Sequence, residues 1–412
     1  MTAETAPLVP RMKDQGYEPD QVAQRRQWLE EITGAKLHHV GACSVDPREM
    51  RGNIENPIGA AQIPIGVAGP LLVRGQHAQG TFYVPLATTE GALVRSYERG
   101  MALLTRAGGV QVRVYGDENR VAPVFAFDDV VSAYEFARWL PSQWEAIRAE
   151  AGSTTRHGRL EKIETYPAGR DVMVNFRFFT ADAHGMNMIV KAADKACKWI
   201  MANSRARHYL VFSGLESEKH ASGFLFPGGK GKKVVAGARI PAHLCKAYLR
   251  AAPEDFTALW RHTVTGHVHA GAQGYNGHFA NGLTAMFIAC GQDVANVVNS
   301  AMGITGFETT GDGELYASVT LPALTVATVG GGTGLGTGRE CLETMGCAGQ
   351  GRAGKLAEIF AAAVLAGELS MGAAIMSGEF VSAHESYGRN RPKEAVENRG
   401  FGDERQRKDG AE

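Results

Sequence analysis

The chain has few of the features that mark several common classes of protein. Its 412 residues include only six cysteines, with no CxxC pair and no histidine and cysteine ladder, so the sequence predicts neither a zinc site nor a disulfide framework. Basic and acidic residues are equal at 43 each, which favours neither a nucleic-acid surface nor an acidic tail. We therefore expect no metal and no nucleic-acid partner, and scattered unpaired cysteines are typical of a reducing, cytoplasmic setting.

Long uninterrupted apolar runs are also missing. Residues 1–16 lack the charged-then-apolar pattern of a signal peptide. Residues 355–384 form an alanine-rich segment, but Glu358, Glu368 and Glu379 interrupt it, and its longest uncharged run is shorter than the ~18 residues of a membrane span. We expect no membrane segment, and we interpret this stretch and residues 263–292 as buried core helices.

The sequence also lacks a Rossmann nucleotide-binding motif. Gly334-Leu335-Gly336 follows strand-like residues 315–329, but it has no third glycine in register and no acidic residue downstream. Glycine itself is abundant, with 51 residues against an average usage of ~7%. Because glycine permits close backbone approach, its clustering favours a site built from loops.

One such loop is DAHGMNM at residues 182–188. The preceding residues 171–180 alternate apolar and other side chains as a half-buried strand does. The following residues 188–201 repeat apolar side chains at helical spacing, on a face made of Ile189, Ala192, Ala193, Ala196, Cys197 and Ile200. A helix start offers unpaired N–H groups and the positive end of the helix dipole, so an anion such as a phosphate can bind there. The alternative is an ordinary strand-to-helix turn that binds nothing.

The order of predicted elements indicates an α+β protein. We expect a first helix over residues 20–37, capped by Asp20, and a second helix through Met101, capped by Thr88 or Thr89. Strands and helices alternate within residues 121–212, which predicts an inserted domain of ferredoxin-like (split βαβ) type. This inserted domain would carry the 182–188 loop.

Three charged residues stand out, and each also has an ordinary explanation. Glu90 lies in TTEG, where a solvated carboxylate in the first turn of a helix is the simpler interpretation. Lys219 lies in a polar glycine-rich crossing and resembles many surface lysines. Asp293 ends the mostly apolar run TAMFIACGQD, so we expect it to have a charged or hydrogen-bonding partner.

Taken together, nine segments of the chain resemble the 3-hydroxy-3-methylglutaryl-coenzyme A (HMG-CoA) reductase family. They occur in the order and with the approximate spacing of the family's catalytic portion, and the ATTEG form is similar to the class that includes animal and many archaeal and bacterial enzymes. The segments are ENPIG (55–59), IPIGVAGPL (63–71), PLATTEG (85–91), DAHGMNM (182–188), GYNGH (274–278), ACGQD (289–293), TVGGGT (328–333), LAGELS (365–370) and AHESYGR (383–389).

The resemblance implies a reacting set. Glu90 would be the catalytic glutamate, Lys219 the catalytic lysine and Asp293 the aspartate that links them. His384 would protonate the coenzyme A thiolate, although outside the family it would be an ordinary helix-end histidine. The resemblance also implies substrate contacts at Arg120, Ser213 and Asn276.

The resemblance further implies a nicotinamide-dinucleotide site in the 182–188 loop and the TVGGGT turn. Its residues would be Asp182, Gly185, Met186, Asn187, Met188, Gly330, Gly331, Gly332 and Thr333. Lys191, Lys195 and Lys198 would accept a 2′-phosphate, and no acidic residue obviously selects a ribose hydroxyl, so we expect NADPH.

The implied architecture has four parts. A large, mostly helical substrate-binding and dimerisation domain would span residues 51–120 plus 213–391, and the NADP-binding domain would be the inserted 121–212. Residues 1–50 would form an N-terminal arm and helix, and residues 392–412 a charged tail. As in the family, we expect a homodimer or higher even oligomer whose active sites combine two chains, with Glu90 and Asn187 contributed by different chains.

The chain departs from the family pattern in one region. Where the family has DAMGMN this chain has His184, and where it has Asp-Lys-Lys this chain has Glu218-Lys219-His220, in a segment one residue shorter. Reduction of HMG-CoA to mevalonate is the activity the resemblance implies. These departures leave a reductase of a related acyl thioester as an alternative, and a non-catalytic homologue acting as a binding protein is a second alternative.

Overall fold

The computed structural model describes residues 8–12, 16–155 and 157–378. Helices and strands alternate along the chain, and the strands pair into one mostly antiparallel, ten-stranded arrangement with the principal order β7-β4-β6-β3-β8-β10-β9. The strands are β1 (Ile65–Arg74), β2 (Gln79–Ala87), β3 (Val110–Val121), β4 (Val124–Ala126), β5 (Arg159–Ala168), β6 (Asp171–Phe179), β7 (His208–Leu210), β8 (Gly231–Ile240), β9 (Ile304–Thr309) and β10 (Leu315–Leu324). The protein is therefore a mixed helix and sheet fold.

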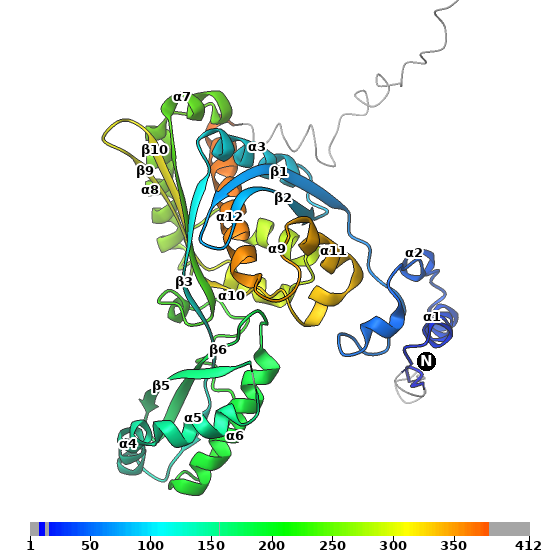
Figure 1. Cartoon of the computed structure of the whole chain (residues 1–412), viewed down its shortest axis with the longest axis vertical. Helices are drawn as coiled ribbons and strands as arrows, with labels where there is room; N and C mark the ends of the chain where they lie inside the picture. Colours follow the sequence, from blue (N-terminus) through cyan, green and yellow to red (C-terminus); the bar gives the residue numbers. More distant parts are fainter. Residues whose placement is uncertain (1–7, 13–15, 156, 379–412) are drawn as a thin grey trace, which may run out of the picture.

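Apart from α1, which stands away from the sheet, the longer helices pack against these strands, and short helical turns connect the elements (Figure 1). The α-helices are α1 (Pro19–Thr33), α2 (His38–Gly41), α3 (Leu93–Arg106), α4 (Val130–Trp139), α5 (Trp144–Gly152), α6 (Met186–Asn203), α7 (Ala242–Leu244), α8 (Pro253–His269), α9 (Phe279–Ala289), α10 (Val297–Ser300), α11 (Gly336–Thr344) and α12 (Ala353–Ser377). The short turns are η3 (Pro47–Met50), η4 (Leu140–Gln143), η5 (Gly223–Leu225), η6 (Cys245–Leu249), η7 (Val294–Asn296) and η8 (Gly331–Gly334).

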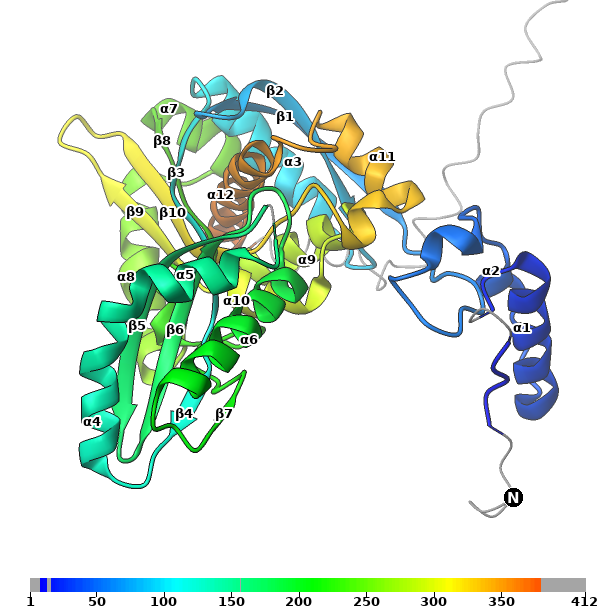
Figure 2. The same ribbon diagram turned by 60° about the horizontal axis from the view of Figure 1, so that its bottom comes forward.

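Two hydrophobic cores form. The smaller core is built from residues between Val121 and Ile200, and Figure 2 shows its strands β5 and β6 lying between α4 and α6. The larger core draws on residues 68–112 and 234–373 and surrounds α12. Strand β3 joins them, because its first half pairs with β8 and its last residues, Asn119–Val121, pair with β6. Side chains at the end of β3 therefore lie where the two parts meet.

Helix α12 explains the apolar C-terminal segment. It is long and apolar enough by composition to cross a membrane, but most of that stretch is buried inside the fold. Its two carboxylates are also buried, and each accepts several hydrogen bonds: Glu358 from the backbone at residues 76–78, and Glu368 from Gly277 and His278. This matches the expected core helix.

Several expected elements differ from the structure. Helix α1 is capped by Glu18 rather than Asp20, and it ends at Thr33 because Gly34 takes a left-handed conformation with φ 72°. Helix α3 starts at Leu93, after Ala92 with φ 70°, so Glu90 precedes the helix instead of lying in its first turn. The larger part is also less helical than expected, since β1, β2, β3, β8, β9 and β10 form a sheet around which its helices pack.

Candidate active site

The structure pairs two of the predicted catalytic residues. Lys219 Nζ lies 2.8 Å from Asp293 Oδ2, and each side chain is 42% exposed. Burial alone would raise the pKa of Asp293, but the hydrogen bond and positive charge of Lys219 outweigh it and hold that pKa below its ordinary value. Asp293 is therefore ionised at neutral pH and has the partner that its sequence context predicted. The pair brings together loops 74 residues apart in the sequence.

The loop that carries Lys219 has an unusual backbone. Ser217 and Lys219 both have positive φ, 52° and 57°, a conformation that costs a non-glycine residue roughly 1–2 kcal/mol. Such strain persists only where the surroundings hold the chain in place. Ser213, at the start of this loop, bonds through its backbone N–H to Ala122 and accepts the Leu215 N–H on its hydroxyl. The loop is thus tied to the end of β3.

Glu90 has a different neighbour from the one expected. Its carboxylate accepts a hydrogen bond of 2.9 Å from Asn281 on α9, and the Thr88 hydroxyl accepts the Glu90 N–H at 3.0 Å. The side chain is exposed in the single chain. The resemblance implied that Asp293 links Glu90 and Lys219. In the structure Asp293 contacts Lys219, and the hydrogen-bond partner of Glu90 is Asn281.

The predicted substrate-binding residues Arg120 and Asn276 both make internal hydrogen bonds. Arg120 is buried; its Nε donates to Gly229 O, a second guanidinium nitrogen donates to Gly228 O, and the group stacks on Phe224. Burial, with a smaller effect of Arg177, lowers its pKa to about 10. Asn276 donates through Nδ2 to Ala301 O and Gly303 O. These contacts fix the positions of the loops that carry Gly228, Gly229 and Gly303.

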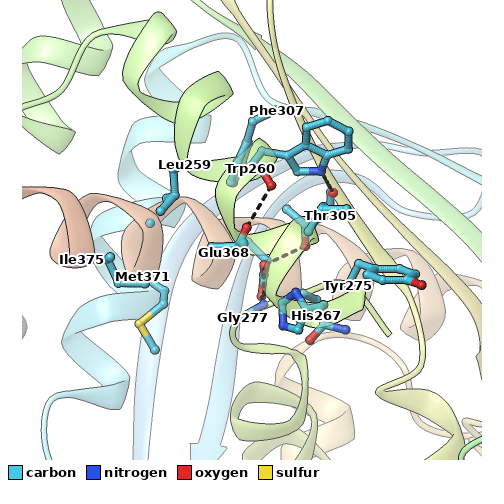
Figure 3. A pocket seen from close by; sticks show the side chains of 14 residues that line it. Leu259, Trp260, His267, Tyr275, Gly277, Thr305, Phe307, Glu368, Met371 and Ile375 are labelled. Atoms are coloured by element: carbon cyan, nitrogen blue, oxygen red, sulfur yellow. Dashed lines mark hydrogen bonds between the residues drawn. The ribbon is translucent and has the colours of Figure 1, made fainter. Parts of the chain in front are cut away.

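Asn276 lies on a pocket between α8 and α12. Figure 3 shows Trp260, Thr305 and Glu368 converging there, and Met371 and Ile375 line one side. Trp260 Nε1 donates to Thr305 O at 2.6 Å, and the Thr305 hydroxyl donates to Glu368 at 2.6 Å. Burial raises the pKa of Glu368, and the hydrogen bonds it accepts oppose that shift. The carboxylate therefore holds the pocket wall together.

The predicted dinucleotide loop opens α6 as expected, two residues earlier than the sequence suggested. Gly185 is the residue before the helix, with φ 72°, and no side chain caps the first turn. The N–H groups at Met186 and Asn187 therefore have no partner within the helix, and Asn187 is exposed. An anionic group fits this helix start.

Asp182 joins the dinucleotide loop to the neighbouring TVGGGT turn. Its carboxylate accepts N–H groups of Gly351 and Ala353 at 2.7 and 3.1 Å, at the start of α12, and its carbonyl accepts the Thr328 N–H at 2.9 Å. Asp182 thus fixes the backbone of the TVGGGT turn and of the α12 start. Both oxygens of its carboxylate already accept hydrogen bonds from the protein.

The glycine turn leaves space on one side and is tightly packed on the other. Gly330 and Gly331 have φ of 84° and 56°, and a side chain at either would meet open space, whereas one at Gly332 would clash with Gly291 O. The Thr333 hydroxyl donates to Gly330 O at 2.7 Å. Open backbone here and free N–H groups at the α6 start are what a dinucleotide requires, so these residues fit the cofactor that the family implies.

The three lysines on α6 are not equivalent. Lys198 pairs with Asp194 at 2.7 Å and Lys195 approaches Glu150 at 3.7 Å. At ~1.5 Å of rise per residue, Lys191 lies about 8 Å from the helix start and Lys198 about 18 Å. Of the three, Lys191 is best placed for a phosphate near the loop.

A buried polar ring next to Lys219 was not predicted. Asn119 Nδ2 donates to the His184 carbonyl at 2.8 Å, and Lys230 Nζ donates to Asn119 Oδ1 at 2.7 Å. Lys230 also forms an ion pair with Glu218. Glu218 Oε1 in turn lies 3.4 Å from His184 Nε2, which closes the ring. Lys230 is fully buried. One sequence signal pointed to this ring, since His184 and Glu218 are two of the three positions, with His220, where the chain departs from the family pattern.

His384 lies outside the residues that the structure describes, so its predicted role stays a prediction. Within the described ranges, no group of three or more histidine, cysteine, aspartate or glutamate side chains is arranged to hold a metal ion.

Comparison with solved structures shows which known fold the chain shares. The structure resembles that of a class II 3-hydroxy-3-methylglutaryl-CoA reductase from Streptococcus pneumoniae, described as bound to NADPH, with a TM-score of 0.66 and 19% identity over 86% of this chain and 96% of that chain. At this identity the likeness concerns the fold alone.

Sequence comparison then identifies the family. The model of the hydroxymethylglutaryl-coenzyme A reductase family matches residues 21–389. The 3-hydroxy-3-methylglutaryl-coenzyme A reductase of Methanothermobacter thermautotrophicus is 44% identical to this chain, over 89% of this chain and 92% of its own length. That of Pyrococcus horikoshii is 43% identical, over 89% of this chain and 91% of its own length. The chain therefore belongs to the hydroxymethylglutaryl-coenzyme A reductase family.

Proposed function

We propose that the protein reduces 3-hydroxy-3-methylglutaryl-CoA to mevalonate and free coenzyme A, a four-electron reduction that uses two NADPH and two protons. The observation that carries this proposal is the contact between Lys219 and Asp293, 2.8 Å apart, in a protein of this family. The archaeal relatives match most of this chain, and both are named as 3-hydroxy-3-methylglutaryl-coenzyme A reductases, which supports the same substrate.

Lys219 would stabilise the charge that develops on the thioester oxygen. When a hydride attacks a thioester carbonyl, the oxygen becomes negative, and a fixed ammonium group next to it lowers the barrier. The lowered pKa of Asp293 keeps this carboxylate ionised next to Lys219, so that it can orient the ammonium group. Asp293 thus acts on the reaction through Lys219.

Glu90 would supply a proton later in the reaction. The aldehyde stage needs a proton donor within hydrogen-bond reach of the carbonyl oxygen, and a carboxyl group held by Asn281 can be oriented for that task. His384 would protonate the expelled coenzyme A thiolate, whose ordinary pKa is near ~8.5, and so stop it from adding back to the aldehyde.

NADPH would supply the hydrides, bound by the opening of α6 and the TVGGGT turn. Support comes from the uncapped first turn at Met186 and Asn187 and from the open backbone at Gly330 and Gly331. The solved S. pneumoniae relative is described as bound to NADPH. Lys191 would favour the 2′-phosphate over an unphosphorylated ribose.

The two hydrophobic cores support a division into an inserted ferredoxin-like NADP-binding domain, 121–212, and a larger substrate-binding domain from 51–120 plus 213–391. The separate core between Val121 and Ile200 favours the first boundary. Ser213 lies at the return crossing, where it is bonded to Ala122.

We propose that the active protein is a cytoplasmic homodimer with shared sites. Strands β1 and β2 present exposed apolar side chains on one chain, including Val67 at 61%, Tyr83 at 55% and Ile65 at 48% exposure. The helices α1 and α2 also stand apart from the rest of the chain (Figure 1). Apolar surface of this kind is typical of an interface between copies.

The test is to follow NADPH absorbance with purified protein and different acyl-CoA substrates. Turnover with 3-hydroxy-3-methylglutaryl-CoA well above that with acetyl-CoA or succinyl-CoA supports the proposal. Preference for another acyl group would favour a related thioester reductase. Tight binding of the acyl-CoA without NADPH oxidation would indicate a binding protein.

A further inference from the structure

The buried polar ring of His184, Asn119, Lys230 and Glu218 connects four separate segments. His184 lies in the loop that opens α6, Asn119 at the end of β3, Lys230 just before β8, and Glu218 immediately before Lys219. Each contact in the ring joins one segment to the next, so the ring links the dinucleotide loop to the lysine loop without using a residue of the Lys219 and Asp293 pair.

The ring is well buried. The side chains of His184 and Glu218 are 20% and 15% exposed, and that of Lys230 is fully covered. Within the described part of the chain, His184 Nε2 and Glu218 Oε1 are buried and make no hydrogen bond. The two atoms lie 3.4 Å apart, so each is the polar group that the other faces. A buried charge that loses its partner is strongly unfavourable, so the contact between Lys230 and Glu218 resists opening.

His184 also lies within electrostatic reach of the catalytic pair. Burial is the main reason that its pKa lies at about 4; the charges of Lys230 and Lys219 also lower this pKa, and that of Asp293 raises it. The ring and the predicted reacting groups are therefore neighbours in space.

The backbone next to the ring needs support. Glu218 lies between Ser217 and Lys219, the two residues with left-handed φ angles. A strained backbone of this type keeps its shape only where side chains on either side fix it. Glu218, held by Lys230 and facing His184, is the side chain at that position.

We propose that His184 and Glu218 are positioning residues that fix Lys219 relative to the dinucleotide loop. The proposal rests on the proposed function, because it assigns these residues the task of setting the distance between the Lys219 ammonium and the hydride donor. The two residues that face each other are also two of the three positions, with His220, where the chain departs from the family pattern.

The test compares three variants of the full-length protein. His184→Met removes the polar contact and keeps a side chain of similar bulk, whereas His184→Gln keeps an N–H donor of similar reach. His208→Ala is the control, at an exposed histidine on β7. Two quantities are measured: amide hydrogen exchange of residues 213–222 without ligands, and kcat and KM for NADPH.

We expect His184→Met to speed exchange in residues 213–222 several-fold and to lower kcat by about 10-fold, with KM for NADPH within about twofold, because a small displacement of a catalytic group affects chemistry more than binding. His184→Gln and His208→Ala should match the unmodified protein in both measurements. Unchanged exchange or unchanged kcat in His184→Met would overturn the proposal, as would a His184→Gln protein as impaired as His184→Met.

A thermal melt identifies variants that fail to fold. If His184→Met does not fold, Glu218→Asp replaces it in the same comparison, since this change keeps the charge and withdraws it by one methylene. If the unmodified protein does not reduce the acyl-CoA, the proposed function fails, while the exchange measurement on ligand-free protein still decides whether His184 holds the loop.

Discussion

The lysine loop and the opening of α6, the two halves of the proposed site, are built in contrasting ways. The lysine loop uses charged side chains in defined pairs, such as Lys219 with Asp293 and Glu218 with Lys230. The α6 opening uses backbone N–H groups and glycines, with Asp182 as an internal brace. We therefore expect the reacting half to depend on particular charges and the cofactor half to depend on backbone shape.

Replacing the central charge should have the largest effect. Lys219→Met removes the ammonium opposite the developing oxyanion, and we expect kcat to fall by ~10²–10³ while the fold remains. A half-exposed ion pair contributes under about 1 kcal/mol, so the free energy of unfolding in urea should change little.

The control for this change is Lys246→Met, which replaces an exposed lysine in η6, outside the lysine loop. Near-normal turnover by Lys219→Met, or an equal loss in Lys246→Met, would remove Lys219 from the mechanism.

Mixing inactive variants tests whether the Glu90 and the Asn187 of one site come from different chains. Glu90→Gln and Asn187→Ala proteins, unfolded together and refolded, should recover about a quarter of normal activity, because about half of random dimers are mixed and each mixed dimer has one intact site. Confirmed mixed dimers without activity would place Glu90 and Asn187 of one chain in the same site.

The brace at Asp182 should affect stability and cofactor binding together. Asp182→Asn replaces a carboxylate that accepts two backbone N–H groups, so we expect a loss of about 1–2 kcal/mol in the free energy of unfolding and weaker NADPH binding. Urea unfolding and NADPH fluorescence titration measure the two effects. Asp128→Asn, which loosens an exposed pair with Arg207, is the control and should change neither.

The smallest effect concerns cofactor choice. Lys191→Ala should lower the ratio of kcat/KM for NADPH to that for NADH, whereas Lys198→Ala should leave the ratio unchanged, because Lys198 is distant from the helix start and paired with Asp194. Equal ratios in both variants would show that a different group binds the 2′-phosphate.

The regular elements near the site could be read from the sequence. The buried face of α6 is the predicted one, with Ile189, Ala193 and Ile200 all fully covered, because helical periodicity is a local property. Strand β6 was predicted as well, within one residue of its end.

The contacts between distant segments could not be read in the same way. The sequence gives no distance between Lys230 and Glu218, or between Asp182 and the start of α12, since these depend on how the two cores pack. Helix boundaries set by left-handed residues other than glycine, such as Ala92 before α3, were missed because nothing local distinguishes them. The positions of His184 and Glu218 were visible only as departures from a pattern.

The most direct test of the central proposal is the stoichiometry of the reaction. Purified protein is given a limiting amount of 3-hydroxy-3-methylglutaryl-CoA and excess NADPH, and NADPH oxidation is compared with the coenzyme A thiol released. We predict two NADPH oxidised per thiol, with mevalonate as the product. One NADPH per thiol with an aldehyde product, or no oxidation with this acyl group, would contradict the four-electron reduction.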